Sequence, residues 1–450
     1  MSNELKPLHF DADYTMEEAL AEAKRCLNCP KPLCRMGCPI ENEIPRFIQA
    51  IAHGNFGLAN DILAERTNLP SICGRVCPRE NQCEGNCIMN KAKKPPINIG
   101  KLERFAADFE SINELRKPKK IKQDLGKVAV VGSGPAGLSV AGDIAKLGYE
   151  VTVFEGQSEP GGVLLFGIPE FRLSKSVVRR EIARLEGLGV KFVCNTFIGQ
   201  DKTLDELFAE GFDSIFIGTG THIPQEVRME NDEVHGVFQA MYLLTNVQLV
   251  DNGELDAEQI PVKKGDRVII IGGGNVAMDA ARTCVRLGCE SVTVAYRRSQ
   301  EQMPALLSEY EEARAEGVQF QWFASPVGVE GKDKVEGFKY EVMALNEDGA
   351  GIHGTGKFQV MPVDKIIIAA GHKPNARLIG EGNNLKVDEK GYIITSEDPY
   401  GMTNRDGVFA GGDVVHKPAT VVLAMREAKK AVDGMVKYME IKKAQESANQ

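Results

Sequence analysis

The sequence has no long hydrophobic run, no secretory signal and no excess of positive charge. No apolar stretch approaches the roughly 18 residues needed to span a bilayer, so a membrane-spanning segment is not predicted. The N-terminal stretch MSNELKPLHFDADYTMEEA has no apolar core and contains acids, unlike a signal peptide. A net charge of −9 argues against nucleic-acid binding, which usually needs a basic face. We therefore expect a cytoplasmic protein whose partners include neither a membrane nor nucleic acid.

The chain of 450 residues is long enough for about three domains of roughly 150 residues each. Its 46 glycines exceed average usage, as repeated glycine-rich nucleotide loops would require. Residues 1–118 are predicted to form short helices between cysteine loops, with helices over Thr15–Cys26 and Ile97–Phe109. The basic stretch from Arg116 to Lys122 is interpreted as a solvated linker. The polar chain beyond Val436 is expected to fray.

The stretch from Lys127 to Glu155 has the order strand, glycine turn, helix and strand that is typical of a βαβ unit. In its GxGxxG turn, Gly132 permits the tight turn, Gly134 lets a pyrophosphate approach the backbone, and Gly137 allows helix and strand to pack closely. The pyrophosphate would lie at the positive end of the helix, and Glu155 would accept the ribose hydroxyls. The residues predicted to line this turn are Gly132, Gly134, Pro135, Ala136 and Gly137.

A second unit of the same kind begins at Arg267, and its turn is a GxGxxA variant. Where the first unit ends in an acid, this one ends in Tyr296, Arg297 and Arg298. An acid would repel a 2′-phosphate whereas arginine pairs with it, so this site favours NADPH over NADH. The alternative is that the arginines are ordinary surface residues. The turn residues predicted to hold the nucleotide are Gly272, Gly274, Asn275 and Val276, followed by Ala277.

Three further segments indicate which site holds the flavin. The stretch GVFAGGDVV, which contains Gly412 and Asp413, resembles the late FAD motif of flavoprotein reductases with two dinucleotide domains, whose aspartate holds the ribityl chain. IFIGTG, which ends at Gly220, and IIIAAGHKP resemble the crossover strands of the same proteins. Thr420 is predicted to cap a helix whose first amides face the flavin and stabilise its anionic reduced form.

No CxxC motif lies near either dinucleotide unit, so the chain lacks the redox pair of the disulfide reductases. Cys194, Cys284 and Cys289 are interpreted as small buried hydrophobic residues. Eight of the 11 cysteines instead fall in two compact N-terminal runs, each of which contains a Cys-Pro pair. Zinc is the competing metal, but such runs resemble ferredoxin ligation, and a flavin needs a one-electron outlet. The runs are Cys26, Cys29, Cys34 and Cys38, then Cys73, Cys77, Cys83 and Cys87.

The whole chain resembles the family of the glutamate synthase small subunit. That family includes the large subunit of the NADH-dependent ferredoxin:NADP+ oxidoreductase and the N-terminal half of dihydropyrimidine dehydrogenase. The motifs that carry the resemblance occur in family order from residue 26 to 415. They are CLNCPKPLCRMGCP, SICGRVCPRENQCEGNC, INIGKLERFA, VVGSGPAGL, GGVLLFGIPEFRL (which begins at Gly161 and Gly162), IGGGNVAMDAART, AYRR and FAGGDVV.

The resemblance implies a specific set of ligands for two [4Fe-4S] clusters. One cluster would take Cys26, Cys29, Cys34 and Cys87, and the other Cys38, Cys77, Cys83 and Glu103, with Cys73 a bystander. Glu103 is assigned by the resemblance alone, and the alternative is an exposed helix acid. Dihydropyrimidine dehydrogenases typically have glutamine at that position, which argues against pyrimidine reduction.

The predicted fold is α/β, with two Rossmann-like dinucleotide-binding domains preceded by a helical iron–sulfur domain. The predicted domains are 1–118 for the clusters, 126–225 with 371–450 for FAD, and 226–370 for NADPH. The resemblance implies an oxidoreductase that exchanges a hydride with NADPH and relays electrons to a partner subunit, the glutamate synthase large subunit. The main alternative is a bifurcating transhydrogenase that works with a small ferredoxin-reductase-like flavoprotein and ferredoxin. An electron-input subunit of dihydropyrimidine dehydrogenase and a non-catalytic relay also stay open.

Overall fold

The computed structural model describes residues 14–112, 121–347, 349, 351–374, 383–417 and 419–448. These residues form two compact units, each with its own hydrophobic core. The smaller unit comprises Phe166–Phe171 and Pro224–His372, and the larger unit comprises the described parts of Asp11–Leu165, Arg172–Ile223 and Lys373–Gln450. The three predicted domains stay a prediction, and their boundary at residue 118 lies outside the described residues. No described helix is both long enough and apolar enough to cross a membrane.

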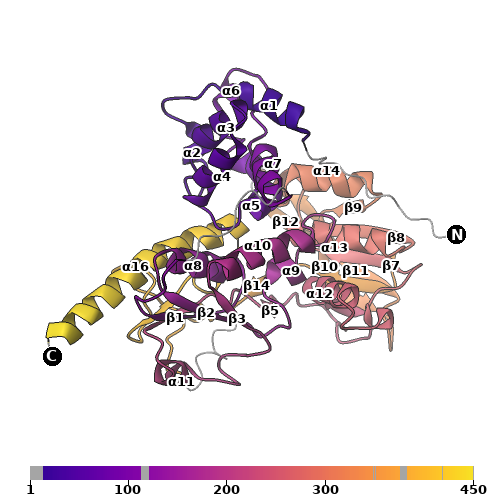
Figure 1. Ribbon diagram of the computed structural model, residues 1–450. Helices are drawn as coiled ribbons and strands as arrows, with labels where there is room; N and C mark the ends of the chain where they lie inside the picture. The colour runs from indigo at the N-terminus through magenta and orange to yellow at the C-terminus, as the bar shows by residue number, and fades with distance from the viewer. Residues whose placement is uncertain are drawn as a thin grey trace. The chain divides into compact units, whose positions relative to one another are not determined.

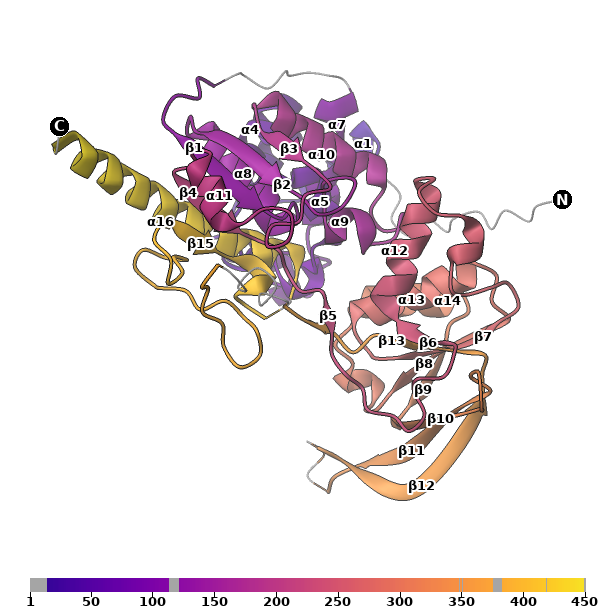
Figure 2. The same ribbon diagram turned by 90° about the horizontal axis from the view of Figure 1, so that it is seen from below.

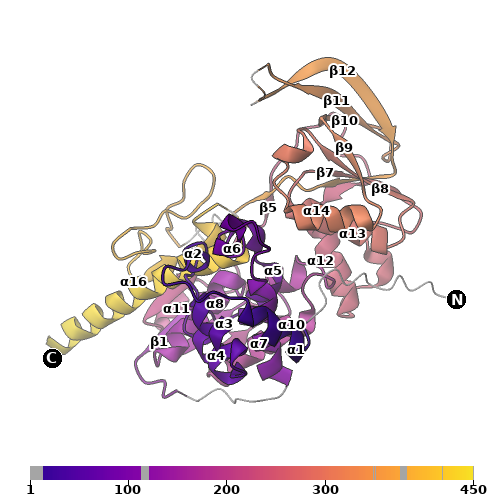
Figure 3. The same cartoon turned by 90° about the horizontal axis from the view of Figure 1, so that it is seen from above.

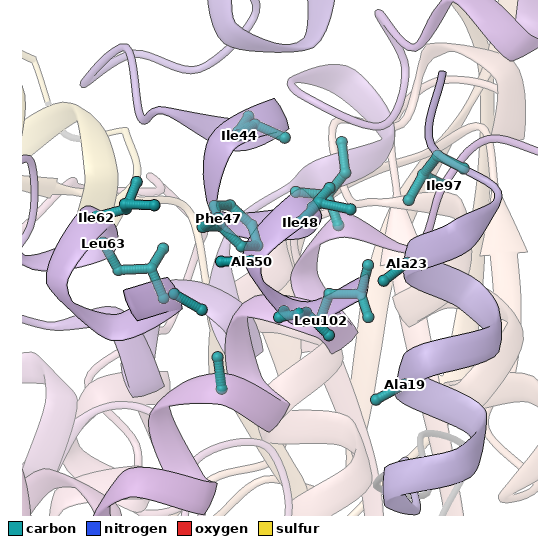
Figure 4. Close-up of a cluster of buried hydrophobic side chains, with 14 of the residues drawn as sticks. Ala19, Ala23, Ile44, Phe47, Ile48, Ala50, Ile62, Leu63, Ile97 and Leu102 are labelled. Atoms are coloured by element: carbon teal, nitrogen blue, oxygen red, sulfur yellow. The ribbon is translucent and has the colours of Figure 1, made fainter. Parts of the chain in front are cut away.

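The N-terminal part of the larger unit is a group of short helices, α1 to α7 (Figure 1). Apolar side chains at helical spacing, among them Phe47, Ile48 and Leu63, meet in a core from which water is excluded (Figure 4). Helix α1 starts where Thr15 and Glu18 form a capping box, in which each side chain accepts a hydrogen bond from the other's backbone N–H. The helices are α1 (Met16–Lys24), α2 (Leu33–Met36), α3 (Ile44–Ala52), α4 (Phe56–Ala64), α5 (Pro70–Val76), α6 (Ile88–Lys91) and α7 (Ile99–Ile112), with the short η1 (Arg79–Asn81).

A parallel five-stranded sheet with the order β15-β4-β1-β2-β3 forms the rest of the larger unit (Figure 2). Its central strands are buried on both faces, which explains why they consist almost entirely of apolar residues. Helix α16 packs along α8. The strands are β1 (Lys127–Val131), β2 (Glu150–Phe154), β3 (Lys191–Val193), β4 (Ser214–Ile217) and β15 (Val408–Ala410); the helices are α8 (Pro135–Lys146), α9 (Val163–Phe166), α10 (Lys175–Gly187), α11 (Leu204–Ala209), η4 (Gly412–Val414) and α16 (Val421–Ala448).

The smaller unit contains a second parallel sheet, β6-β13-β7-β8-β9, and an antiparallel sheet, β10-β11-β12. Two short strands, β5 (Ile223–Pro224) and β14 (His372–Lys373), pair where the chain enters and leaves this unit. The strands are β6 (Val237–Gln239), β7 (Arg267–Ile271), β8 (Ser291–Tyr296), β9 (Gln319–Trp322), β10 (Ala324–Glu330), β11 (Gly337–Leu345), β12 (Ile352–Pro362) and β13 (Lys365–Ile368); the helices are α12 (Ala240–Asp251), η2 (Ala257–Gln259), α13 (Asn275–Arg286), η3 (Gln300–Gln302) and α14 (Leu307–Ala315). The fold is therefore the predicted α/β class, with two Rossmann-like domains preceded by a helical domain.

Both predicted N-terminal helices are present, as α1 and α7, and both predicted βαβ units have the expected strand–helix–strand order. The prediction that the chain beyond Val436 frays is wrong, because α16 continues to Ala448. The sequence EIKKAQESA near its end consists largely of good helix formers, which extend a helix already packed on α8. Most of the basic linker stretch lies outside the described residues.

Within the larger unit, the helical domain is joined to the sheet domain by buried polar contacts. The side-chain amide of Asn68 donates to the Ser139 carbonyl at 3.2 Å and to Asp143 at 2.8 Å. A Cβ at Gly142 would lie 2.6 Å from the Asn68 side chain, so only glycine allows this approach. Next to this contact, the backbone N–H of Ser71 donates to Glu181 at 3.1 Å.

Asp108 of α7 forms the charged part of the same junction. Its carboxylate accepts hydrogen bonds from Arg75 of α5 and Arg180 of α10, and Arg75 is 9% exposed. We expect Asp108→Ala to lower the free energy of unfolding by about 3 kcal/mol, because it leaves the nearly buried Arg75 without a counter-charge. Urea denaturation would measure the loss.

The matched control is Glu65→Ala, which removes the ion pair between Arg46 and Glu65. That pair is about half exposed on both sides, so its removal should cost less than about 1 kcal/mol. Equal losses for the two variants would contradict a structural role for the Asp108 junction.

Candidate dinucleotide and cluster sites

The glycine turn of the larger unit connects β1 to α8. Gly132 has a φ of +93°, a left-handed conformation that favours glycine. A Cβ at Gly137 would lie 1.9 Å from the Gly132 carbonyl oxygen, so the helix start packs directly on the turn. At Gly134 no described atom lies within 4 Å of the Cβ position, which leaves open space at the start of α8. The turn therefore fits a pyrophosphate, whose charge the helix N-terminus would stabilise.

Glu155 follows β2 and is buried beside this turn. Its carboxylate accepts hydrogen bonds from the Ser133 backbone at 3.0 Å, from the Ser133 hydroxyl and from the Gln157 backbone at 2.9 Å. The Ser133 hydroxyl in turn accepts from the Gly161 backbone at 2.8 Å. Ser133, which the GxGxxG pattern leaves unspecified, thus joins Glu155 to the Gly161 loop. The predicted ribose contact would use the remaining acceptor capacity of Glu155.

Two other predicted flavin residues, Gly162 and Gly412, lie against the same turn. A Cβ at Gly162 would lie 3.0 Å from Gly134, and one at Gly412 would lie 2.8 Å from the Ala136 side chain. Gly220 has a φ of +69° with no described atom near its Cβ position. Asp413 is half-buried, and this burial raises its pKa to about 6.

Helix α16 begins directly after Thr420, as predicted. The Leu423 backbone donates to the Thr420 hydroxyl at 3.4 Å, a long capping contact, and the helix starts at Val421. A Cβ at Gly412 would also lie 3.7 Å from the Ala424 side chain of α16, so the late FAD motif lies between the start of this helix and the turn at Ala136.

The glycine turn of the smaller unit connects β7 to α13. A Cβ at Gly272, where φ is +146°, would lie 2.4 Å from the Ala369 carbonyl, while Gly274 faces open space. The Asn275 side chain accepts from the Leu306 backbone at 3.1 Å, and Val276 is half-buried. Ala277 is fully buried where the GxGxxG pattern has its third glycine. At its first two glycines the turn resembles the first one, with a close approach at Gly272 and open space at Gly274.

Arg297 and Arg298 follow β8, next to this turn. The ring of the preceding residue, Tyr296, would lie 2.6 Å from a Cβ at Gly273, which places the end of β8 against the turn. Both arginines are exposed, and neither forms an ion pair with a described residue. Two exposed cations at this position fit the 2′-phosphate of NADPH.

The structure brings the first predicted cluster set together. One pocket is lined by all four cysteines of that set, together with apolar side chains that include Leu33, Ile48 and Ile97. Burial raises the pKa of Cys34 to about 12 and raises that of Cys26 as well. Both thiols are therefore neutral without a metal, and a metal would have to displace their protons. The set is Cys26, Cys29, Cys34 and Cys87.

The second predicted set surrounds Glu103, which is not the exposed helix acid of the alternative interpretation. Glu103 is 8% exposed, and burial raises its pKa to about 8. It lies close enough to Cys38, Cys77 and Cys83 to raise the pKa of each thiol, in addition to the effect of their burial. A buried carboxylate among thiols is unfavourable unless a cation is present, and the charge of Arg79 offsets the effect of burial on the pKa of Glu103 only in part. This group therefore fits the chemistry of a cluster site.

Cys73 lies beside the second set. It shares a helical face with Cys77, and their side chains hydrogen-bond. Its sulfur also lies 3.8 Å from the Thr67 hydroxyl and 3.8 Å from the Met425 sulfur of α16. Its predicted role as a bystander stays a prediction.

Within the described residues, no group of three or more His, Cys, Asp or Glu is arranged to hold a single metal ion. Of the other cysteines, Cys284 is buried as predicted, but Cys194 and Cys289 are only partly buried, so the prediction is wrong for these two. Both follow the ends of elements, after β3 and α13, where the chain reaches the surface.

Comparisons with known proteins agree with this geometry. Residues 126–428 match the pyridine nucleotide-disulphide oxidoreductase family, and residues 6–115 match dihydropyrimidine dehydrogenase domain II, 4Fe-4S cluster. FprA of Mycobacterium tuberculosis in complex with NADPH has the same fold, with a TM-score of 0.58 and 20% identity over 72% of this chain and 86% of that one. The fold and sites define an oxidoreductase of the FAD and pyridine-nucleotide class that carries a 4Fe-4S domain.

Two curated relatives extend over nearly the whole chain. The glutamate synthase [NADPH] small chain of Escherichia coli K12 is 37% identical over 94% of this chain and 92% of its own. The NAD-dependent dihydropyrimidine dehydrogenase subunit PreT of the same organism is 34% identical over 95% of this chain and 96% of its own. The chain belongs to the family of the glutamate synthase small chain.

Proposed function

We propose that this chain oxidises NADPH and passes the electrons, through FAD and two [4Fe-4S] clusters, to a partner subunit. The observation that carries the proposal is the grouping of the cysteines into two sets, one around a pocket and one around the buried Glu103. Two sets of four ligands are what two clusters require. In each dinucleotide turn the first glycine packs closely on the neighbouring backbone, and the second glycine, Gly134 or Gly274, faces open space in which a pyrophosphate could lie.

In the smaller unit, the start of α13 would bind the pyrophosphate of NADPH, and Arg297 and Arg298 would bind its 2′-phosphate. In the larger unit, Glu155 would hold the ribose of FAD and Asp413 its ribityl chain. The FAD bound there would accept a hydride from NADPH and release electrons one at a time. That chemistry needs no side-chain acid or base, so the protein supplies orientation and electrostatics. The amides after Thr420 would stabilise negative charge on the reduced ring.

The partner is proposed from the relatives. The glutamate synthase name of the relative described above indicates a large glutamate synthase subunit as the partner. A small ferredoxin-reductase-like flavoprotein, as in a bifurcating transhydrogenase, is the second candidate, because it would use the same residues. The buried Glu103, where dihydropyrimidine dehydrogenases typically have glutamine, argues against pyrimidine reduction.

Anaerobic purification of the tagged chain from its native host, followed by mass spectrometry of the co-purifying chain, tests the partner. A large amidotransferase-containing chain would establish the glutamate synthase role. A small flavoprotein would establish the transhydrogenase role instead. A purified chain that reduces no dye with NADPH would contradict both and leave only a non-catalytic relay.

A further inference from the structure

Glu103 of the second predicted set has a buried hydrogen-bond partner, Asn42. Asn42 lies four residues after Cys38, in the loop that leads to α3, and Glu103 lies on α7. The side-chain amide of Asn42 donates to the Glu103 carboxylate at 3.3 Å, and the two residues are 2% and 8% exposed. Figure 3 shows α3 and α7 together in the helical domain, where they pack against each other. The hydrogen bond thus joins two segments that are distant in the sequence, in a place from which water is largely excluded.

The side chain of Asn42 is unfavourable to bury at this position. Its oxygen, Oδ1, accepts no hydrogen bond from any residue that the structure describes. Among those residues, the Glu103 carboxylate is also the one partner of the side-chain nitrogen. Burying a polar atom without a partner costs free energy, and a leucine, which is similar in size, would avoid that cost. The contact with Glu103 is therefore the feature that distinguishes asparagine from an apolar residue here.

The shape of the loop does not require this amide, because backbone hydrogen bonds close its turn. The Glu41 N–H donates to the Cys38 carbonyl at 2.9 Å. The Ile44 N–H donates to the Asn42 carbonyl at 2.7 Å, and the Asn42 N–H donates to the Cys38 sulfur. Main-chain groups supply every donor, so other side chains could occupy the same turn. The loop nevertheless places Asn42 in contact with Cys38 and Glu103, two of the four predicted ligands of one cluster.

We propose that Asn42 is a positioning residue for the cluster of the second predicted set, and that it raises the reduction potential of that cluster. The inference rests on the proposed function, because it assumes that Glu103 is a ligand there. A hydrogen bond to one carboxylate oxygen, Oε1, restricts the rotation of the carboxylate and leaves Oε2 for an iron atom. The amide also withdraws negative charge from the carboxylate. Since reduction makes a cluster more negative, this withdrawal favours the reduced state and raises the potential.

Asn60 provides a matched comparison within the helical domain. It lies on α4, is 4% exposed, and its side-chain amide donates to the Ala106 carbonyl of α7 at 2.6 Å. Both asparagines are thus buried amides that hold α7, but of the two only Asn42 contacts a predicted ligand. A general loosening of α7 would follow from the loss of either amide. A change in one cluster alone would follow only from the loss of Asn42.

The test compares Asn42→Leu with Asn60→Leu in the anaerobically purified holoenzyme, by redox titration of both clusters followed by EPR. We expect Asn42→Leu to shift the midpoint potential of one cluster to a more negative value and to leave the other unchanged. Release of iron to a chelator should become about tenfold faster for that cluster, because the loss of an outer-shell partner weakens metal binding. Complete loss of its EPR signal, with the other signal kept, would also support the positioning role. Asn60→Leu should leave both potentials unchanged, even though it lowers the temperature of unfolding.

Unchanged potentials in Asn42→Leu, a shift to a more positive value, or equal shifts in the two leucine variants would each overturn the proposal. Asn42→Ala makes the same test if the leucine variant does not fold, since it removes the amide without adding bulk. Wild-type protein that binds fewer than two clusters would instead refute the proposed function. The two failures are distinguishable, because an unchanged potential in a protein with two clusters refutes only the role of Asn42.

Discussion

Replacing Glu103 with alanine is expected to remove one of the two reduced-cluster EPR signals and about half of the bound iron. Glu103 is buried among Cys38, Cys77 and Cys83, and alanine supplies no fourth ligand there. The first cysteine set lines a pocket to which Glu103 does not contribute, and it should keep its cluster. EPR of the dithionite-reduced protein together with iron analysis would measure the effect.

Two further variants separate ligation from packing. Cys73→Ala removes a buried side chain beside Cys77 but should keep both EPR signals if Cys73 is a bystander. Glu103→Gln keeps a ligand oxygen and should keep both clusters. It should also raise the potential of one of them, because a neutral amide favours the more negative reduced state. Loss of a signal in Cys73→Ala, with both signals kept in Glu103→Ala, would exchange the roles of these residues.

The dinucleotide turns could be read from the sequence because their requirements are local. Gly132 must be glycine because its φ is left-handed, and Gly137 must be glycine because a Cβ there would lie 1.9 Å from the Gly132 carbonyl oxygen. Both requirements follow from the local order of strand, turn and helix. The third position of the second turn tolerates alanine, since Ala277 is fully buried without such a close approach. The backbone geometry of each turn thus determines where glycine is required and where alanine is allowed, and the sequence shows this directly.

Contacts between distant segments could not be read in the same way. Nothing near Asp108 in the sequence indicates that Arg180, on a helix of the sheet domain, completes its ion pair. Ser133 occupies a position that the glycine pattern leaves free, yet it links Glu155 to Gly161. Glu103 could be predicted as a ligand only from the family resemblance. Its position in the sequence does not distinguish it from an ordinary acidic residue on a helix. Such residues are specified by the tertiary fold and not by local pattern.

The largest effect on substrate choice is expected from Arg297→Ala combined with Arg298→Ala. This double variant should raise the KM for NADPH about 100-fold, or roughly 2.8 kcal/mol, because it removes two charge-assisted contacts to the 2′-phosphate. The KM for NADH, which has no such phosphate, should change little. Steady-state reduction of a neutral quinone with each nucleotide would measure the ratio.

Arg228→Ala is the matched control, since Arg228 is an exposed arginine of the same unit that is not part of the predicted site. It should leave both KM values unchanged, which would show that the loss in the double variant is not a general effect of charge. Equal rises of the two KM values in the double variant would mean that the arginines position the turn and do not select the phosphate. Because both side chains are exposed at the end of β8 without an ion pair to a described residue, their removal should cost the fold little. A selective loss would therefore report on the nucleotide and not on stability.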